Sequence, residues 1–575
     1  MRLFTLLVTF LLQFDIASSS AYSLDLGSKR PYVELETDSG IILPYASNAL
    51  DNVTDSVSDR TIFVALISRH GARYPTEKKL QRMRGFAQAM REGGITSGNS
   101  SLIEGGSTML AMLGNAAPAD LAPRGEHEMS AMGAAAAEAY PEIFLGRAPS
   151  RQRVYSYEVR VTTAARTVQS CKSFFRGVAK VGERRNGRQG QHRAQQHEHA
   201  LPPPLSSAAA ADYYCNSDDA VDDVLLRPYA SCAAQQVVRN ERKAARASYE
   251  EALSAEARRF AALEVLHVSP KTVRRWDSEN QAESGKGAGM EEGQAASKED
   301  QKAHLGSTPF SAWIACQLAH TLTTGTTIGC ESADLTSRAN STDTAATNIC
   351  TTGSKKNRDG IDARKQIEDK ADSSLACRMV KPFRHAFSAL EDRESFEERG
   401  FSEDYPVSRF LMARFLQHIT ARLRGAAMAS QKRESLSKWR HKDTTRPEIS
   451  DKQQEEARQS QQKADASTLI PPQLGLYFAH DSSLLPLMAM MGLVDFGTSD
   501  PSASGAARHC PFASRLIIEL RKSGTIVVLY NGHVVRRFIR GLVEWEATYS
   551  GALEMDIKEL CQKEPGEVSS SLLRS

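Results

Sequence analysis

The chain has 575 residues, a formal net charge of +3 at pH 7 and nine cysteines. Its length suffices for about three domains of roughly 150 residues each, and a charge so close to neutral indicates no particular partner. The basic residues occur without stacking aromatics or a nucleic-acid motif, so no nucleic-acid partner is predicted. The cysteines include no CxxC pair, so the sequence predicts no zinc site.

The N-terminal 21 residues are arranged like a secretory signal peptide. Arg2 precedes an apolar run of about 12 residues, and small residues follow between Ala17 and Ala21. The run is shorter than the roughly 20 apolar residues of a membrane span, and an uncleaved anchor is the alternative interpretation. No later run is long enough to span, and the C-terminus has no retention signal. The sequence therefore predicts the secretory pathway, with secretion or an endolysosomal or ER lumen as the destination.

Entry into that pathway gives meaning to two further features. The triplets that begin at Asn52, Asn99 and Asn340 fit the N-glycosylation sequon. In an oxidising lumen some of the nine cysteines are expected to form disulfides, with at least one left over. The sequence leaves their connectivity open.

Strands and helices alternate at both ends of the chain. Thr61–Ile67 is a continuous apolar run with β-branched residues, as in a strand buried on both faces. In chain order, the other predicted core elements are a helix over Glu126–Tyr140, a strand over Val154–Val161, a helix over Arg166–Val178, a strand over Leu474–Phe478, a helix over Ser482–Met491, and a strand meander over Leu516–Leu520, Ile526–Tyr530 and Val534–Ile539.

The middle of the chain is mainly helical between polar tracts. Apolar residues three and four positions apart predict helices within residues 237–266, 310–322 and 404–423. We therefore expect an α/β core sheet flanked by helices over residues 61–181 and 469–545, with an inserted, mainly α-helical cap region over residues 213–424. Tracts poor in apolar residues are predicted to be disordered insertions: residues 182–212 and 425–468, and residues 278–307 and 330–374 within the cap region.

Positive charge is concentrated where the first predicted strand ends. Arg69, His70 and Arg73, within RHGARYP, are expected to project into the crevice where open α/β sheets bind ligands. Two guanidinium groups suit a tetrahedral phosphate, and Gly71 lets the main chain approach a ligand closely. The nearby charge favours the neutral form of His70, which a nucleophile needs. For an isolated Arg-His pair, a surface turn with a capping histidine is the alternative.

RHGARYP resembles the RHGxRxP signature of the histidine phosphatase superfamily, in the branch of the acid phosphatases and phytases. Ser68–Thr76 most resembles the SRHGxRYPT of the multiple inositol polyphosphate phosphatases. The resemblance implies a histidine-phosphatase-like core sheet. It also implies a third clamp arginine in TTAARTVQSCKSFFRGV, where Arg166 has the family's spacing to Phe174 and Gly177. Arg160 is the rival candidate.

A second part of the family pattern occurs late in the chain, in LYFAHDSSLL. By resemblance, His480 would contact phosphate and Asp481 would donate a proton. The multiple inositol polyphosphate phosphatases typically have His-Ala-Glu here, whereas His480-Asp481 follows the wider acid phosphatase and phytase pattern, which bears on positional preference. Asp481 is also placed to be a helix N-cap, the alternative interpretation.

The resemblance implies hydrolysis of phosphomonoesters through a phosphohistidine on His70, without a cofactor. No metal is needed, because arginines supply the positive charge. Inositol polyphosphates such as phytate are the expected substrates. A broad-specificity acid phosphatase and an inactive phosphate-binding protein are the alternatives. Lys78 and Lys79 are candidates for the rim of the pocket, or else belong to a solvated helical face. The predicted partner is thus a small phosphate ester, with no membrane span beyond the signal peptide.

Overall fold

The computed structural model describes residues 59–97, 100–114, 116–145, 157–187, 209–216, 222–237, 239–240, 410–443, 474–493 and 510–562, with single residues at 205, 257, 377, 378 and 387. The predicted signal peptide, the three sequons and most of the predicted cap region and insertions lie outside these residues. None of the helices in the described segments has the length and apolarity that crossing a membrane demands.

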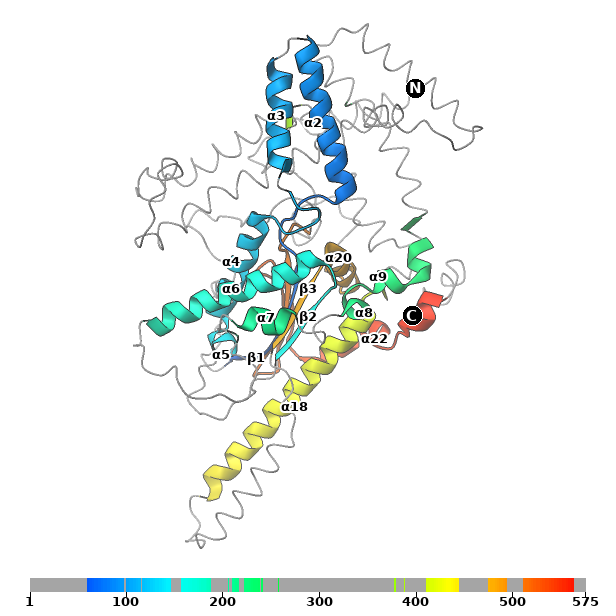
Figure 1. The fold of residues 1–575 in the computed structure, drawn as a ribbon. Helices are drawn as coiled ribbons and strands as arrows, with labels where there is room; N and C mark the ends of the chain where they lie inside the picture. Colours follow the sequence, from blue (N-terminus) through cyan, green and yellow to red (C-terminus); the bar gives the residue numbers. More distant parts are fainter. Residues whose placement is uncertain are drawn as a thin grey trace, which may run out of the picture.

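The core of the described segments is a mixed six-stranded sheet with the strand order β2-β3-β1-β4-β5-β6 (Figure 1). β2, β3 and β1 run parallel, and β4, β5 and β6 continue the sheet antiparallel. The predicted α/β core is therefore confirmed. The strands are β1 (Thr61–Arg69), β2 (Tyr157–Val161), β3 (Leu474–Ala479), β4 (Arg515–Arg521), β5 (Ile526–Tyr530) and β6 (His533–Phe538).

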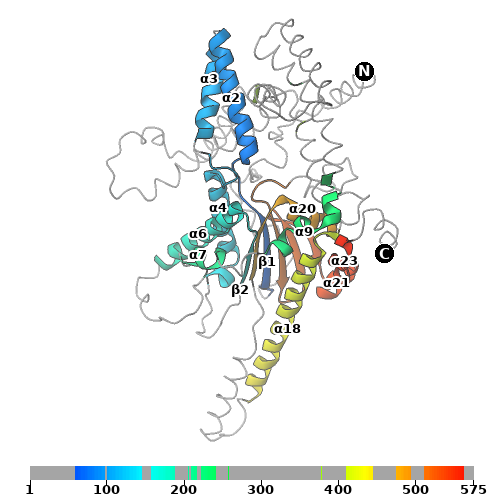
Figure 2. The ribbon, with the colours of Figure 1, turned by 45° about the vertical axis from the view of Figure 1, so that its right-hand side comes forward.

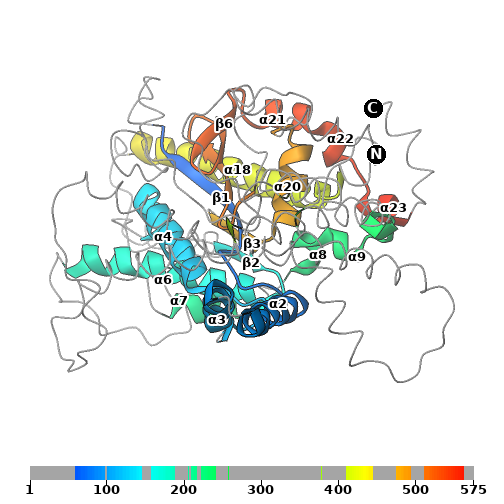
Figure 3. The ribbon, with the colours of Figure 1, turned by 90° about the horizontal axis from the view of Figure 1, so that it is seen from above.

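Helices cover both faces of this sheet, as Figure 3 shows from above. One face packs against α4 (Pro123–Ala139), α5 (Pro141–Phe144), α6 (Ala165–Gly187) and α7 (Ala210–Cys215), and the other against α18 (Ala413–Asp443), α20 (Asp481–Met490), α21 (Leu542–Thr548) and α22 (Ser550–Leu553). Successive side chains of β1 alternate between the two faces: Phe63 and Ala65 join the α18 layer, and Val64 and Leu66 the α6 layer. The unbroken apolar run of β1 is explained by this double burial.

Close packing holds α6 against α4. A Cβ on Gly177 would lie 1.9 Å from the carbonyl oxygen of Ser130, so only glycine permits this helix crossing. Phe174, three residues earlier, packs on Phe478 of β3 with ring centroids 5.5 Å apart. The Phe174 and Gly177 positions of the family pattern thus fix the height and orientation of α6 above the sheet.

The described cysteines confirm that some pair and that at least one does not. Cys171 of α6 is bonded to Cys215 of α7, and Cys377 is also in a disulfide. Cys510 is free and buried. Cys232 is bonded across 329 residues of sequence to Cys561. Cys232 follows α8 (Asp223–Leu226) and α9 (Pro228–Ser231), and Cys561 lies in α23 (Ile557–Gln562).

A helical hairpin, α2 (Glu77–Ser97) and α3 (Ser100–Gly114), projects beyond the end of the sheet where β1 terminates (Figures 1 and 2). The sequence analysis did not predict this hairpin. It follows the RHGARYP stretch directly, so residues 77–114 continue the chain on this side of the sheet.

Three predicted boundaries are wrong. α18 was expected to end the cap region at residue 424 before a disordered tract, but it packs on the sheet through Phe415, Leu416 and Ile419 and continues to Asp443. Its extension is rich in Ala, Lys and Arg, which have high helix propensity. α6 similarly continues to Gly187, into the tract 182–212. The core also extends past residue 545, because α21 and α22 bury Trp545 and Tyr549 against the sheet.

Candidate active site

The carboxyl ends of the three parallel strands meet at one edge of the sheet. Arg69 ends β1 opposite Ala479, the last residue of β3, and Val161 ends β2 opposite Phe478. The main-chain N–H of His70 donates to the carbonyl of Ala479 at 3.0 Å. The residues that follow each strand therefore converge at the edge where parallel sheets bind ligands.

His70 is only 2% exposed, and its ring orientation is fixed by one hydrogen bond. Nδ1 lies 2.8 Å from the carbonyl oxygen of Gly71, so Nδ1 carries the proton and donates it. Nε2 has no hydrogen-bond partner among the described residues. Burial lowers the pKa of His70 well below its usual value, and the charges of His480, Arg69, Arg166 and Arg73 lower it further. The imidazole is therefore neutral, with the lone pair of Nε2 available as a nucleophile.

Arg69 is held on three sides and is 2% exposed. Its Nη2 lies 3.1 Å from Oδ2 of Asp481, and its Nη1 donates to the carbonyl of Cys510. The guanidinium lies 4.3 Å above the centre of the Phe512 ring, whose own centre is 5.7 Å from that of His70. Phe512 thus forms an apolar wall beside both residues.

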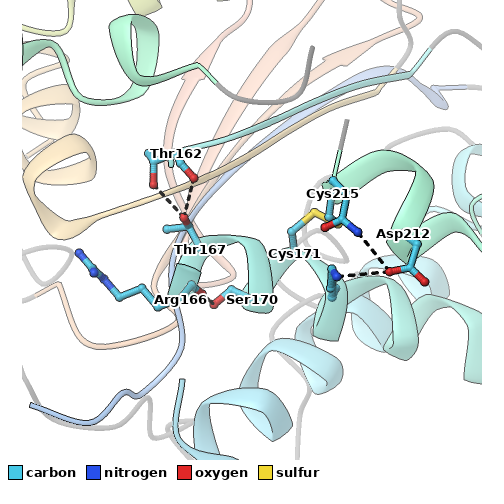
Figure 4. Close-up of a disulfide and its surroundings, with 9 residues drawn as sticks. Thr162, Arg166, Thr167, Ser170, Cys171, Asp212 and Cys215 are labelled. Carbon is cyan, nitrogen blue, oxygen red and sulfur yellow. Dashed lines mark hydrogen bonds and ion pairs between the residues drawn. A yellow bond between two sulfur atoms is a disulfide. The ribbon is translucent and has the colours of Figure 1, made fainter. Parts of the chain in front are cut away.

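Arg166 lies in the first turn of α6 and extends away from the Cys171–Cys215 disulfide, as Figure 4 shows. Its Nη2 lies 3.3 Å from Nδ1 of His480. Because a guanidinium can only donate, Nδ1 of His480 must be the acceptor and Nε2 must hold the proton. Nε2 lies 3.0 Å from Oγ1 of Thr162, which lies 2.8 Å from Oγ1 of Thr167. Oγ1 of Thr167 donates to the carbonyl of Thr162, so the Thr162 hydroxyl donates to Thr167 and accepts from Nε2. The two buried threonines therefore favour the same tautomer of His480.

His480 is buried as well, and burial is the main reason why its pKa lies well below the usual value. The charges of Arg166 and Arg227 add to this lowering, whereas Asp481 opposes it. The rings of His70 and His480 lie 5.4 Å apart in an edge-on arrangement. The site thus contains two neutral histidines surrounded by guanidinium groups.

Asp481 is the first residue of α20, and the N-cap of that helix is His480. Its Oδ1 accepts from the N–H of the adjacent Ser482 at 2.8 Å, not from the N–H two or three residues on, as an N-cap side chain does. Its Oδ2 pairs with Arg69. The N-cap interpretation of Asp481 is therefore wrong, and its carboxyl group faces the arginine cluster.

The RHGARYP loop is fixed by contacts with the helices of one face. The N–H of Gly71 donates to Oγ of Ser170 at 3.1 Å, and Ser170 donates to the carbonyl of Arg166 at 2.7 Å. A Cβ on Gly71 would lie 2.4 Å from the carbonyl oxygen of Gly125, so the close approach requires glycine. The loop that contains His70 and the helix turn that contains Arg166 are therefore held by one continuous set of contacts.

The structure brings most of the predicted site residues together. Arg69, His70, Arg166, His480 and Asp481 are linked by the contacts above. Arg73 joins them through the charge that it exerts on both histidines, while its Nη1 donates to the carbonyl of Tyr74.

Three other candidates stand apart from these contacts. Arg160 is not brought to the strand ends, because its Nε pairs with Glu158 on the same strand at 3.1 Å. Lys78 and Lys79 lie in the first turn of α2, so their place at the pocket rim stays a prediction.

Sequence reasoning missed Phe512, Thr162, Ser170 and Arg227. Thr162 and Ser170 lie within the quoted stretch around Arg166, four residues before and after it, and that proximity was the available signal. Phe512 and Arg227 are distant from the other site residues in sequence, so only the fold places them. No group of three or more metal-ligating side chains occurs in the described part of the chain.

A comparison with protein-family profiles matches the segment that contains several of these site residues. A profile of the histidine phosphatase superfamily (branch 2) matches residues 61–281, from β1 past Arg166 and Arg227. The resemblance to this superfamily is confirmed. The match supports phosphatase activity. The comparison with curated protein sequences found no match.

One solved structure has a similar fold, and a second is less alike. The multiple inositol polyphosphate phosphatase of Bifidobacterium longum, in complex with phosphate, is 12% identical, with a TM-score of 0.50 over 90% of this chain and 93% of that one. The phytase from D. castellii is 13% identical, with a TM-score of 0.41 over 96% of this chain and 92% of that one. At this identity the first likeness is one of fold alone, and it agrees with the predicted histidine-phosphatase-like sheet.

Proposed function

We propose that the protein hydrolyses phosphomonoesters through a phosphohistidine intermediate on His70. One observation supports this above all: Nε2 of a buried, neutral His70 is unbonded within the described residues and lies amid three arginines. Several guanidinium groups gathered around a buried neutral imidazole favour an anionic ligand, since burying like charges together is costly. A tetrahedral dianion would neutralise the arginines and accept their hydrogen bonds.

In the first step, Nε2 of His70 attacks phosphorus in line with the ester oxygen. The N–P bond forms, the P–O ester bond breaks and its electron pair stays on the leaving oxygen. Asp481 gives that oxygen a proton. Arg69, Arg73 and Arg166 stabilise the charge that spreads over the equatorial oxygens. Arg69 pairs with Asp481, so a phosphate that binds Arg69 competes with this pair and releases Asp481 for protonation.

In the second step, water attacks phosphorus while Asp481 accepts its proton. The P–N bond breaks, its electron pair returns to Nε2, and inorganic phosphate leaves. In this state of the protein His480 presents Nδ1 to Arg166, so its contribution to phosphate binding includes orienting that guanidinium.

For the substrate, we propose inositol polyphosphates such as phytate. The fold likeness to the B. longum enzyme and the SRHGARYPT stretch support this choice. A broad-specificity acid phosphatase is the second candidate, favoured by His480-Asp481 in place of His-Ala-Glu. Disulfides such as Cys171–Cys215 support action in an oxidising compartment of the secretory pathway or outside the cell.

The test is phosphate release by the purified chain from inositol hexakisphosphate and from p-nitrophenyl phosphate. His70→Ala is expected to lower kcat by a factor of at least about 10³, since loss of a nucleophile removes the covalent route. His533→Ala, an exposed histidine on β6, is the matched control and retains full activity. Equal rates for the wild type and His70→Ala would exclude the mechanism.

A second measurement separates catalysis from binding. Inorganic phosphate is expected to raise the melting temperature of both the wild type and His70→Ala, because the arginines remain. If phosphate raises the melting temperature of the wild type but the wild type hydrolyses neither ester, the protein is instead the inactive phosphate-binding alternative. Comparable kcat/KM values for both esters would favour the broad acid phosphatase.

A further inference from the structure

The short segment that contains α8 and α9 is attached directly to the rim of the site. The N–H of Asp222 donates to the carbonyl of Val161, the last residue of β2, at 2.9 Å. The Asp223 carboxylate accepts from the N–H of Thr163 at 2.9 Å and from its hydroxyl. Ser483, in the first turn of α20, donates to the carbonyl of Leu226. The segment therefore bridges the ends of β2 and β3 beside His480.

Arg227 follows this bridge directly, and its guanidinium is oriented in advance. Its Nε donates to the hydroxyl of Tyr229 at 3.1 Å, and its Nη1 lies 3.5 Å from Oδ2 of Asp223. Nη2 has no hydrogen-bond partner among the residues that the structure describes. The side chain is 27% exposed, so it is held at two edges and open at the third.

The charge of Arg227 reaches the clamp. It contributes to lowering the pKa of His480, after burial and Arg166. It also contributes to lowering the pKa of Arg166, where burial is again the main cause. The contacts of this segment with Thr163 and Ser483 place Arg227 near His480 and Arg166, which accounts for the influence of its charge.

Three arginines already surround the single phosphate that His70 attacks. A fourth at the rim, with an open edge, has no role in that step. We propose that Arg227 binds a second phosphate group of the substrate, adjacent to the one removed. This inference rests on the proposed function and deepens it, because it selects substrates with at least two neighbouring phosphates over simple monoesters.

The matching experiment compares Arg227→Met with the wild type on two substrates. Methionine keeps the apolar stem and removes the charge. The ratio of kcat/KM for inositol hexakisphosphate to that for p-nitrophenyl phosphate is expected to fall about 10- to 100-fold, the effect of one charge-assisted hydrogen bond. Most of this change is expected to come from a higher KM for inositol hexakisphosphate. Arg227→Lys is expected to restore part of it.

Arg160→Met is the control, since Arg160 has a similar exposure and also pairs through Nε with a carboxylate on a nearby residue. It leaves the substrate ratio unchanged. A purely structural Arg227 would lower both kcat/KM values equally along with the melting temperature, and that result overturns the proposal. Should Arg227→Met not fold, Tyr229→Phe removes only the orienting hydroxyl, and an unchanged substrate ratio in that variant also overturns it.

A binding measurement keeps this proposal separate from the proposed function. Calorimetry on His70→Ala with inositol hexakisphosphate and with inorganic phosphate needs no turnover. When Arg227→Met is added to His70→Ala, the affinity for inositol hexakisphosphate is expected to fall at least 10-fold more than the affinity for inorganic phosphate. If the wild type proves inactive but this difference appears, the proposed hydrolysis fails and the second phosphate site stands. Equal weakening of both ligands would refute the site while leaving the hydrolysis untouched.

Discussion

Two arginine-rich clusters lie on the same parallel strands, and they differ in how their charges are neutralised. At the strand ends, Asp481 pairs with Arg69 and its charge also acts on Arg166, so one carboxylate serves more than one guanidinium. Midway along β2 the ratio of cations to carboxylates is resolved differently, because several cationic side chains all contact one carboxylate, that of Glu158. Glu158 accepts from Arg160 at 3.1 Å, from Arg422 at 3.0 Å, from His418 at 3.2 Å and from the Tyr477 hydroxyl at 3.2 Å.

The difference sets a structural cluster apart from the candidate active site. Although burial acts to raise the pKa of Glu158, the hydrogen bond with His418 and the charges of His418 and Arg422 lower it to about 2. These contacts fasten α18 to the sheet. The strand-end cluster has the opposite composition, with several guanidinium groups around Asp481 and two neutral histidines. Residues of the Glu158 cluster should therefore affect stability, and residues of the strand-end cluster should affect chemistry.

The largest contrast is expected from Asp481→Asn, which removes the acid from the strand-end cluster. The rate on inositol hexakisphosphate should fall by about 10² to 10⁴, the usual contribution of a general acid. The fall on p-nitrophenyl phosphate should be much smaller, because nitrophenolate leaves without a proton. Steady-state kinetics on both esters measures this. An equal fall on both would remove Asp481 from the role of proton donor.

Glu158→Gln is the converse change in the structural cluster. It leaves Arg160, Arg422 and partly buried His418 around an amide, and breaking such a buried pair costs about 3 kcal/mol in the free energy of unfolding. Urea denaturation measures the loss, and kcat of the folded variant should stay near that of the wild type. A large loss of kcat at full stability would show that the two clusters are coupled.

The same residue predicts a pH dependence of stability. The pKa of Glu158 is about 2 in the folded protein against a usual 4.5, so its contribution is complete above pH 4.5. It is lost as the pH falls from there towards 2. Urea denaturation of the wild type should show this loss. In Glu158→Gln the stability should depend less on pH over the same range, and an identical dependence would contradict the assignment.

The disulfide behind Arg166 is expected to act on stability alone. Replacing both Cys171 and Cys215 with Ala opens a crosslink across 44 residues and should cost about 2 to 4 kcal/mol. KM should change little, since Arg166 extends away from the disulfide in Figure 4. The melting temperature and KM together check this. An unchanged melting temperature with a raised KM would place the disulfide in the functional cluster.

The smallest effect is expected from Thr162→Val, which keeps the shape of the side chain and removes the hydroxyl that holds Nε2 of His480. Freed from one tautomer, the ring should hold Arg166 less well, and kcat/KM should fall about 10-fold, the worth of one buried hydrogen bond. Thr162→Ser should restore most of the activity. A fall in melting temperature without a change in the pH profile of kcat/KM would indicate a structural role only.

The chemistry of the site was largely readable in the sequence, because its main parts are local. RHGARYP and His480-Asp481 each directly follow an apolar strand, and chain continuity alone places them at strand ends. Arg166 follows Val161 by five residues, so the same holds for it. Continuous apolar runs also predicted β1 and β3, since strands that are buried on both faces are apolar along their whole length.

Only the tertiary structure decided what depends on contacts between distant segments. α18 looked like part of a cap in isolation, because amphipathic spacing indicates a buried face without saying what buries it; packing on Phe63 and Tyr477 assigns it to the core. The Cys232–Cys561 bond joins residues whose pairing no spacing rule fixes. Arg227 and Phe512 reach the site only because the sheet brings β2, β3 and the start of β4 together. Asp481 itself was visible in the sequence, but only the structure shows that His480 is the N-cap of α20 and that the Asp481 carboxylate pairs with Arg69.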